Sequence, residues 1–261
     1  MSETRSKALI TGASSGIGAA YAERLARRGY DLVLVARDRQ RLEARASRIR
    51  DEAKIGVEIL SADLTTSGGL ADVETRLRDD ARIGLFVNNA GAIGLDTLEK
   101  PDLDEVDRII RLNVTATTRL VCAVIPRFLA GSNNAIINIG STVSLIPEVR
   151  LGVYAATKAY LLSFSQILQA QLGPRGLYVQ LVLPSATRTE IWERSGRNVD
   201  SLRAVMAVDE LVDAALIGFD RREAVTIPAL PSPAHWDDFQ SARIALSRNV
   251  GHANVAARYR E

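Results

Sequence analysis

The chain has 261 residues, of which 47% are hydrophobic, so it is long enough and apolar enough to bury a substantial core. Its 33 basic and 31 acidic residues leave a formal net charge of +2, and the arginines are scattered instead of forming a block. This charge distribution argues against a nucleic-acid or membrane surface as the main partner. The sequence has no internal repeat, low-complexity tract or long linker, which predicts one domain over residues 1–261.

The N-terminus leads directly into a short apolar run and lacks the longer hydrophobic stretch of a secreted or membrane-inserted protein, so a cytoplasmic location is expected. Runs rich in Val, Ile and Leu then alternate with amphipathic stretches. The predicted strands are 8–10, 31–35, 57–60, 85–88, 135–139, 179–183 and 224–227. The predicted helices are 16–28, 38–53, 69–80, 103–130, 152–172 and 209–219. This alternation predicts an α/β fold of the Rossmann type, with a doubly wound parallel sheet of about seven strands and helices on both faces.

Single residues add local predictions. Gly29 and Gly173 stand where two of these helices end, as expected for left-handed C-terminal caps. Cys122 lies in an apolar run and is predicted to be a buried structural thiol, and a single cysteine allows no disulfide within the chain. The proline cluster between Pro228 and Pro233 predicts a C-terminal tail over about 231–261.

A glycine-rich turn follows the first predicted strand. Gly12, Gly16 and Gly18 are spaced G-x-x-x-G-x-G, which differs from the commoner dinucleotide pattern G-x-G-x-x-G. Missing side chains allow a tight turn and let a pyrophosphate approach the amides of a helix N-terminus. A plain loop between strand and helix is the alternative interpretation. In a doubly wound sheet the ligand is expected at the carboxyl ends of the strands.

Tyr154 and Lys158 are four residues apart in a predicted helix, which places both side chains on one face. An ammonium beside a phenol favours the ionised phenol, and a phenol of lowered pKa can exchange a proton with an alcohol or carbonyl. The spacing alone is common on solvated helices. Ser141, thirteen residues upstream of Tyr154, and Asn113, earlier still, strengthen the hypothesis of a nicotinamide-dependent oxidoreductase.

The ordered set of motifs resembles the short-chain dehydrogenase/reductase family, in its compact single-domain form, over residues 7 to about 190. The matching pieces are Thr11 to Gly18, Asp63-Leu64, Asn88-Asn89-Ala90-Gly91, Asn113-Val114, Ser141, Tyr154 with Lys158, and Pro184 with Thr189. The resemblance implies that the chain is an enzyme that transfers a hydride between a nicotinamide cofactor and a carbonyl or secondary alcohol.

The resemblance also implies a role for each matching residue. Tyr154 is the general acid in reduction and the general base in oxidation. Lys158 lowers the tyrosine pKa together with the oxidised nicotinamide, and it binds the nicotinamide ribose. Ser141 donates to the substrate oxygen, and Asn113 holds a water that links Lys158 to solvent.

The implied cofactor contacts come from several turns at the strand ends. They are Gly12, Ser14, Ser15, Gly16, Ile17, Gly18, Asp63, Leu64, Asn89, Ala90, Gly91, Tyr154, Lys158, Pro184, Thr187 and Thr189. Asp63 is expected at the adenine ring and the Asn89–Gly91 turn along the adenosine ribose. As alternatives, Asp63 could cap a helix and Asn88-Asn89 could be ordinary turn residues.

The end of the second strand distinguishes NAD from NADP, because an acid there binds the ribose hydroxyls and repels a 2′-phosphate. This sequence has Ala36-Arg37, and a guanidinium suits bidentate phosphate recognition. We therefore predict that Arg37 selects NADP(H), with NAD(H) possible. Asp38 would partly cancel that charge, and Arg39 and Arg41 could restore it. A solvated arginine is the alternative for Arg37.

Residues 185–208 occupy the position of a substrate loop. Ile191, Trp192, Val205 and Met206 could line an apolar pocket or pack as ordinary core, and Arg188, Arg194 and Arg197 could face solvent or an anionic substrate. The expected small-molecule substrate is a moderately apolar ketone, aldehyde or secondary alcohol. His235 and His252 lack metal-ligand spacing, so no metal is expected.

The sequence disfavours two other functions. A non-catalytic NADP(H)-binding sensor or scaffold is disfavoured by the intact catalytic set. A sugar-nucleotide epimerase or dehydratase is disfavoured by the glycine spacing and by the short C-terminal part.

A homo-oligomer, dimer or tetramer, is also expected, through helices 103–130 and 152–172. Their apolar residues exceed what one face against a sheet requires. These residues include Leu120, Val124, Leu161, Phe164 and Leu168.

Overall fold

The computed structural model describes residues 6–94, 98–149, 151–194, 198–202, 204–251 and 253–260, without the side chain of Arg194. The positions of the Cα atoms divide the chain into two compact units, Met1–Pro228 and Ala229–Glu261. The first unit carries the sheet and its helices.

Seven parallel strands form one sheet in the order β3-β2-β1-β4-β5-β6-β7. The strands are β1 (Lys7–Thr11), β2 (Asp31–Ala36), β3 (Val57–Ser61), β4 (Ile83–Asn88), β5 (Ala135–Ile139), β6 (Tyr178–Val182) and β7 (Val225–Thr226). The chain order reverses beside β1, between β1 and β4, which is the topological switch point where ligands bind in such sheets. The predicted Rossmann-type fold is confirmed.

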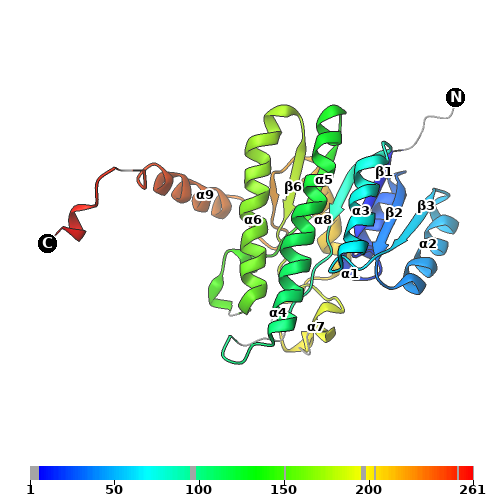
Figure 1. Cartoon of the computed structure of the whole chain (residues 1–261), viewed down its shortest axis with the longest axis horizontal. Helices are drawn as coiled ribbons and strands as arrows, with labels where there is room; N and C mark the ends of the chain where they lie inside the picture. The colour runs from blue at the N-terminus through cyan, green and yellow to red at the C-terminus, as the bar shows by residue number, and fades with distance from the viewer. Residues whose placement is uncertain are drawn as a thin grey trace. The chain divides into compact units, whose positions relative to one another are not determined.

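Helices cover both faces of the sheet (Figure 1). The helices are α1 (Gly16–Arg27), α2 (Arg39–Ala53), α3 (Ser67–Asp79), α4 (Leu103–Ile110), α5 (Thr117–Ala130), α6 (Gly152–Leu172), α7 (Ile191–Arg194), α8 (Val208–Asp220) and α9 (Ala234–Ser247). The shorter helical turns are η1 (Arg111–Ala116), η2 (Thr142–Ser144), η3 (Pro147–Val149), η4 (Gly173–Arg175), η5 (Val199–Ser201) and η6 (Ala257–Tyr259). One hydrophobic cluster joins the sheet to α1, α2 and α8, and another joins it to α3, α5 and α6.

The central strands are apolar throughout because both of their faces are covered. In β1, Leu9 faces the cluster on one side of the sheet and Ile10 faces the cluster on the other, and both are fully buried. Leu9 is paired in register with Val33 and Phe86, so the second cluster continues across three strands. Alternating side chains on buried strands fill both layers, which explains the uninterrupted apolar runs in the sequence.

The predicted helix 103–130 has an internal irregularity. Residues Arg111–Ala116 form a π-helical turn between α4 and α5, and the Thr117 hydroxyl donates to the Leu112 carbonyl at 3.4 Å. Such turns insert a residue into the helix and often occur at functional sites. Here the turn contains Asn113. By length and composition alone, the helical stretch Leu103–Ala130 could cross a membrane. In the most apolar part of this stretch, 39% of the residues are buried inside the fold.

The prediction for Gly29 is confirmed, whereas the prediction for Gly173 is wrong. Gly29 has a left-handed φ of 85°, but Gly173 keeps right-handed helical angles and the chain continues into η4. Gly176 then takes the left-handed cap with φ 90°. Its amide donates to the Gly173 carbonyl, while the next amide, of Leu177, donates to the Leu172 carbonyl. This paired arrangement is a Schellman motif, displaced three residues from the predicted position.

The predicted burial of Cys122 is also wrong, because Cys122 is exposed. In α5 the neighbouring Val121 and Val124 face the sheet, which turns Cys122 outwards. The argument for surplus apolar residues fails at Leu120, Val124, Leu161 and Leu168, which are all buried within the chain's own core. Phe164 alone of the five named residues is half-buried.

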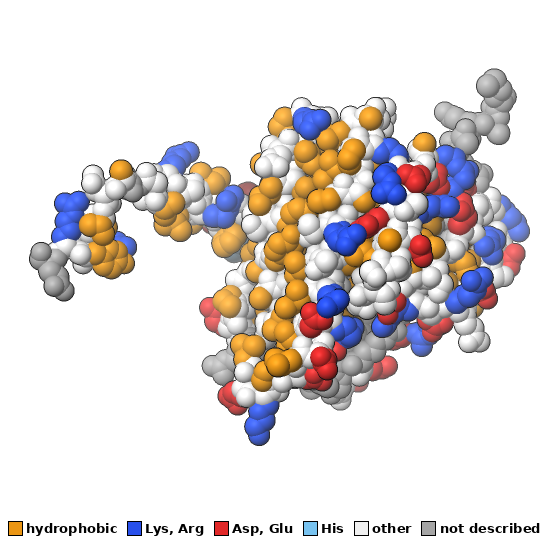
Figure 2. Space-filling view, viewed as in Figure 1, with side chains coloured by type: hydrophobic (Ala, Val, Ile, Leu, Met, Phe, Trp, Pro, Cys, Tyr) orange, Lys and Arg blue, Asp and Glu red, His pale blue; other side chains and the backbone are white. Residues whose placement is uncertain are grey.

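A hydrophobic strip nevertheless runs over α4, α5 and α6 on the outer surface (Figure 2). Its exposed members include Ile110, Tyr160 and Ile167. The Tyr160 ring stacks on Phe164 with ring centres 5.8 Å apart.

The second unit, expected as a tail, contains the 14-residue helix α9. Pro233 stands immediately before the helix, and Trp236 and Phe239 make a ring contact with centres 5.6 Å apart. No residue of α9 is buried.

Candidate active site

A cavity of about 880 Å³ lies at the carboxyl ends of the strands. It gathers residues that follow β1, β2, β3, β4, β5 and β6, as expected for a doubly wound sheet. The predicted site residues that line it are Gly12, Ser14, Ser15, Gly16, Ile17, Arg37, Asp63, Leu64, Asn89, Ala90, Gly91, Ser141, Tyr154, Lys158, Pro184, Thr187 and Thr189. Gly18 and Asn113 lie behind these residues and do not line the cavity.

The glycine turn has no room for side chains. Gly12 has a φ of 69°, and a Cβ there would lie 2.7 Å from the side-chain nitrogen of Asn89. A Cβ on Gly18 would lie 2.5 Å from the Gly12 carbonyl oxygen, and Gly16 has a φ of 55°. Both contacts are shorter than carbon atoms tolerate, so the turn requires glycine. The resulting cradle at the N-terminus of α1 fits the pyrophosphate of a dinucleotide.

Thr11 joins the glycine turn to the turn after β4. Its hydroxyl accepts from the backbone amides of Asn89 and Ala90, both at 3.0 Å, and the Asn89 side chain donates to the Thr11 carbonyl at 2.8 Å. Asn88 takes no part in this junction. Its side chain donates to the side chain of Asn138 at 3.1 Å, and Asn138 in turn donates to Ser165, all within the buried interior. This structural role of Thr11 was not predicted from the sequence. The position of Thr11 directly before Gly12 is the feature that could have indicated it.

Asp63 lies beside Arg37 at one end of the cavity. Its carboxylate accepts from the amide and the hydroxyl of Thr65 at 2.9 and 2.7 Å, while Thr66 caps α3. Burial by itself raises the pKa of Asp63, but these hydrogen bonds and the charge of Arg37 outweigh it and leave the pKa below its usual value. Asp63 is therefore an ionised turn residue and not the helix cap.

Arg37 has a largely exposed side chain, 61% accessible, and its guanidinium lies 3.9 Å from the Asp63 carboxylate. The guanidinium is therefore accessible to an anion that approaches from solvent. Asp38 caps α2 by accepting from the Arg41 amide at 2.9 Å. Arg39 pairs with Glu43 at 2.8 Å, so its charge is directed along α2.

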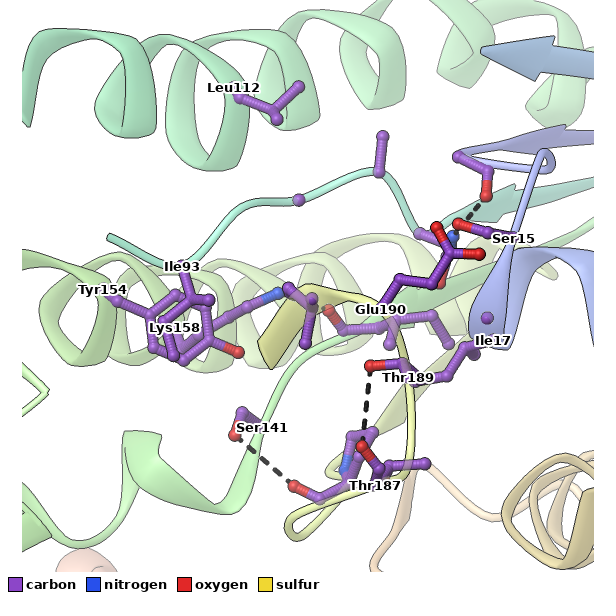
Figure 3. Close-up of a pocket in the computed structure, with 18 of the residues that line it drawn as sticks. Ser15, Ile17, Ile93, Leu112, Ser141, Tyr154, Lys158, Thr187, Thr189 and Glu190 are labelled. Atoms are coloured by element: carbon purple, nitrogen blue, oxygen red, sulfur yellow. Dashed lines mark hydrogen bonds between the residues drawn. The ribbon is translucent and has the colours of Figure 1, made fainter. Parts of the chain in front are cut away.

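Tyr154 and Lys158 project from α6 side by side, with Ser141 opposite (Figure 3). The Lys158 ammonium donates to the carbonyl of Ile139 at 2.9 Å, and the Tyr154 hydroxyl lies beside Ser141. Ser141 also donates to the Pro184 carbonyl at 3.4 Å. Three segments of the chain therefore place their polar groups at one wall of the cavity.

The predicted lowering of the Tyr154 pKa depends on the oxidised nicotinamide as well as on Lys158, and it stays a prediction. Burial raises the pKa of Tyr154 to about 12, against a smaller lowering by the neighbouring Ser141 hydroxyl. The Lys158 ammonium lies 5.7 Å from the centre of the tyrosine ring and donates to Ile139 instead of the phenol. Burial lowers the pKa of Lys158 to about 8. Desolvation therefore dominates for both groups.

Asn113 fixes the loop after β4 to α6. Its side-chain oxygen accepts from the Ala92 amide at 2.9 Å, and its nitrogen donates to the Ala92 carbonyl at 2.8 Å and to Thr157 at 3.0 Å. The π-helical turn aims this side chain at a neighbouring segment, since a regular helix would rotate it.

Part of the cavity wall is apolar. Sequence reasoning identified Ile191 and Trp192 there but missed residues from other segments, whose apolar side chains gave no signal distinguishable from the core. The missed apolar residues are Ile93, Leu112, Val149, Leu151 and Leu202.

Val205 and Met206, expected in this wall, do not line the cavity. Met206 instead makes a parallel bridge with Thr187. The Met206 amide donates to the Ala186 carbonyl, and the Arg188 amide donates to the Met206 carbonyl. Arg188 pairs with Asp200 at 2.7 Å. The side chain of Arg194, together with Arg197 and His252, lies outside the described residues.

The comparison with known proteins agrees with this geometry. The family model described as short chain dehydrogenase matches residues 6–200. A short-chain dehydrogenase from Sphingobium yanoikuyae, solved in complex with NADPH, is 56% identical, with a TM-score of 0.96 and coverage of 98% of this chain and 100% of that one. A bulky-bulky ketone specific alcohol dehydrogenase from Comamonas testosteroni is 48% identical, with a TM-score of 0.92 and coverage of 99% and 100%.

Among curated proteins, the very-long-chain 3-oxoacyl-CoA reductase of Macaca fascicularis is 34% identical over 188 residues, which are 70% of this chain. The match covers only 60% of that protein's length. The family match extends over most of the first unit and includes every motif from the glycine turn to Pro184 and Thr189. The chain belongs to the short-chain dehydrogenase/reductase family of oxidoreductases.

Proposed function

We propose that this protein is an NADP(H)-dependent reductase of apolar ketones, which also oxidises the corresponding secondary alcohols. The proposal rests on one observation: Ser141, Tyr154 and Lys158 line the same cavity as the glycine cradle. The bound nicotinamide would supply the hydride in reduction and accept it in oxidation. We further propose one cofactor-binding domain, with a substrate segment at about 185–208 and a C-terminal tail at about 231–261.

In the proposed reaction Tyr154 donates its phenolic proton to the substrate oxygen. A tyrosine with a pKa of about 12 is protonated at neutral pH, which suits proton donation during carbonyl reduction. The Ser141 hydroxyl donates a hydrogen bond to the same oxygen and stabilises the negative charge that develops there. With a pKa of about 8, Lys158 is mostly charged at neutral pH, and it would bind the nicotinamide ribose. Asn113 holds the loop that contains Gly91 and Ala92 in place through its hydrogen bonds to Ala92. It would also hold a water that resupplies protons to Lys158.

The proposed NADP(H) preference rests on Arg37. Its exposed guanidinium lines the cavity, and position 36, where an acid would repel a 2′-phosphate, is alanine. The solved relative from Sphingobium yanoikuyae was obtained with NADPH, which supports the same choice. NAD(H) would bind more weakly, since the contacts to the pyrophosphate cradle are common to both dinucleotides.

The proposed substrates are ketones with apolar groups on both sides of the carbonyl. The wall contributed by Ile93, Leu112, Val149, Leu151 and Trp192 is apolar and comes from several segments of the chain. The Comamonas testosteroni relative, whose name describes specificity for bulky-bulky ketones, supports this class. The acyl-CoA chemistry of the mammalian relative is less favoured, since the match covers only 60% of that protein.

The test is a panel of ketones and alcohols of increasing size, followed by NADPH absorbance with NADH in parallel. Turnover that increases from small to bulky aryl or alkyl ketones supports the proposal. A protein that binds NADPH tightly but converts none of them would instead be a cofactor-binding sensor or scaffold.

We also propose a cytoplasmic homo-oligomer. The exposed strip that includes Ile110, Tyr160 and Ile167 on α4 and α6 is the surface that pairing of equivalent helices would bury (Figure 2). Light scattering at micromolar concentration tests it, and a monomer would refute it.

A further inference from the structure

An ion pair joins a residue of the cavity wall to α2, which is distant from it in the sequence. Arg41, in the first turn of α2, places its guanidinium 2.7 Å from the carboxylate of Glu190, which is 149 residues away. Glu190 lines the cavity and directly follows Thr189. Figure 3 shows it on the side of the cavity where Ser15 and Ile17 lie. Neither the proposed proton transfer nor the selection of the 2′-phosphate uses this pair.

The fold orients Arg41 towards this contact. Asp38 accepts a hydrogen bond from the Arg41 backbone amide at 2.9 Å, and its carboxylate also lies 3.4 Å from the Arg41 guanidinium. Arg41 is therefore held at the helix start, next to the cavity wall formed by Ala36, Arg37 and Asp38. An arginine aligned in this way loses less conformational entropy when it pairs with Glu190.

The other partner belongs to the segment that forms the substrate wall. Glu190 is followed by Ile191 and Trp192, both of which line the cavity, and the Trp192 indole donates to the Thr187 carbonyl at 2.8 Å. Thr187 is in turn bridged to Met206. A contact at Glu190 therefore holds a connected stretch of chain and not an isolated side chain.

We propose that Arg41 and Glu190 are positioning residues that form a clasp between α2 and the Pro184–Trp192 segment and slow the release of a bound dinucleotide. This inference rests on the proposed function, because it requires NADPH or NADH to occupy the cavity. Since the clasp closes between two side chains of the protein, it acts equally on both dinucleotides. Arg37, in contrast, acts through the 2′-phosphate and affects NADPH alone.

Glu190→Gln is the principal test, with dissociation of NADPH and of NADH measured by stopped-flow fluorescence after displacement. Both dinucleotides are expected to leave about two- to fivefold faster, the scale of a half-exposed ion pair. Glu43→Gln is the matched control. It removes the same charge and breaks the Arg39–Glu43 pair on the same helix, but neither residue lines the cavity. Its dissociation rates should equal those of the unmodified protein.

A double-mutant cycle identifies the partner. Arg41→Gln should also accelerate release, and the double variant Arg41→Gln/Glu190→Gln should release NADH no faster than the faster single variant. Strictly additive effects of the two substitutions would overturn the clasp. So would dissociation rates of Glu190→Gln that equal those of Glu43→Gln or fall below those of the unmodified protein. If the unmodified protein binds neither dinucleotide, both the clasp and the proposed function fail. If it binds both and Glu190→Gln releases them at the unmodified rate, only the clasp fails.

Discussion

The ammonium of Lys158 lies 5.7 Å from the centre of the Tyr154 ring and donates its hydrogen bond to the Ile139 carbonyl at the end of β5. The tyrosine hydroxyl instead lies beside Ser141. One helical turn thus directs a cation and a proton donor to different parts of the same cavity. Because the two groups have separate partners, their contributions can be separated by mutation.

Tyr154→Phe should lower turnover by about a hundredfold or more, because it removes the transferable proton and keeps the ring. Cofactor affinity should remain close to that of the unmodified protein, as measured by titration of NADPH fluorescence. Near-normal turnover of a substrate found in the ketone panel would contradict the role assigned to this tyrosine.

Lys158→Met should change how stability depends on pH. The pKa of the buried lysine falls to about 8 from 10.5, so between these values the unfolded chain binds a proton that the native protein has released. Stability must therefore rise with pH in this window, by about 2 kcal/mol between pH 7.5 and 10. The methionine variant lacks this contribution.

Urea denaturation of both proteins at several pH values measures the difference. The free energy of unfolding of the unmodified protein should rise relative to that of Lys158→Met as pH increases. Parallel curves would show that Lys158 keeps an ordinary pKa.

Gly18→Ala should destabilise the protein by about 1–3 kcal/mol, because its methyl group would meet the Gly12 carbonyl oxygen at 2.5 Å. It should also weaken the binding of both dinucleotides. Gly68→Ala is the matched control, since Gly68 also lies in a helix but has no atom within 4 Å of the added carbon. There the helix propensity of alanine should leave stability unchanged or raise it by up to about 1 kcal/mol. Equal thermal shifts for the two variants would refute the steric argument.

Arg37→Ala should weaken NADPH binding about tenfold to a hundredfold, the scale of a hydrogen bond between charged groups, and leave NADH almost unchanged. Dissociation constants for both dinucleotides should be compared at one ionic strength, because the contact is exposed and screened by salt. Ala36→Asp should shift selectivity further towards NADH. Tighter binding of NADH than of NADPH by the unmodified protein would overturn the cofactor assignment.

The sequence by itself determined the order of strands and helices, the parallel sheet and the position of the cavity-forming turns. These features follow from apolar periodicity and from the turn chemistry of neighbouring residues, as the match of 135–139 to β5 illustrates. The glycines at 12, 16 and 18 were also predictable, since a tight turn before a helix requires them whatever the rest of the chain does.

Only the tertiary structure decided which apolar residues are covered and which charges meet. Cys122 and Val121 are neighbours in one apolar run, but the direction of the sheet buries one and exposes the other. The pairing of Arg41 with Glu190 and the raised pKa of Tyr154 likewise depend on segments that are remote in sequence. Burial and ion pairing are set by distances through space, and a local pattern does not contain those distances.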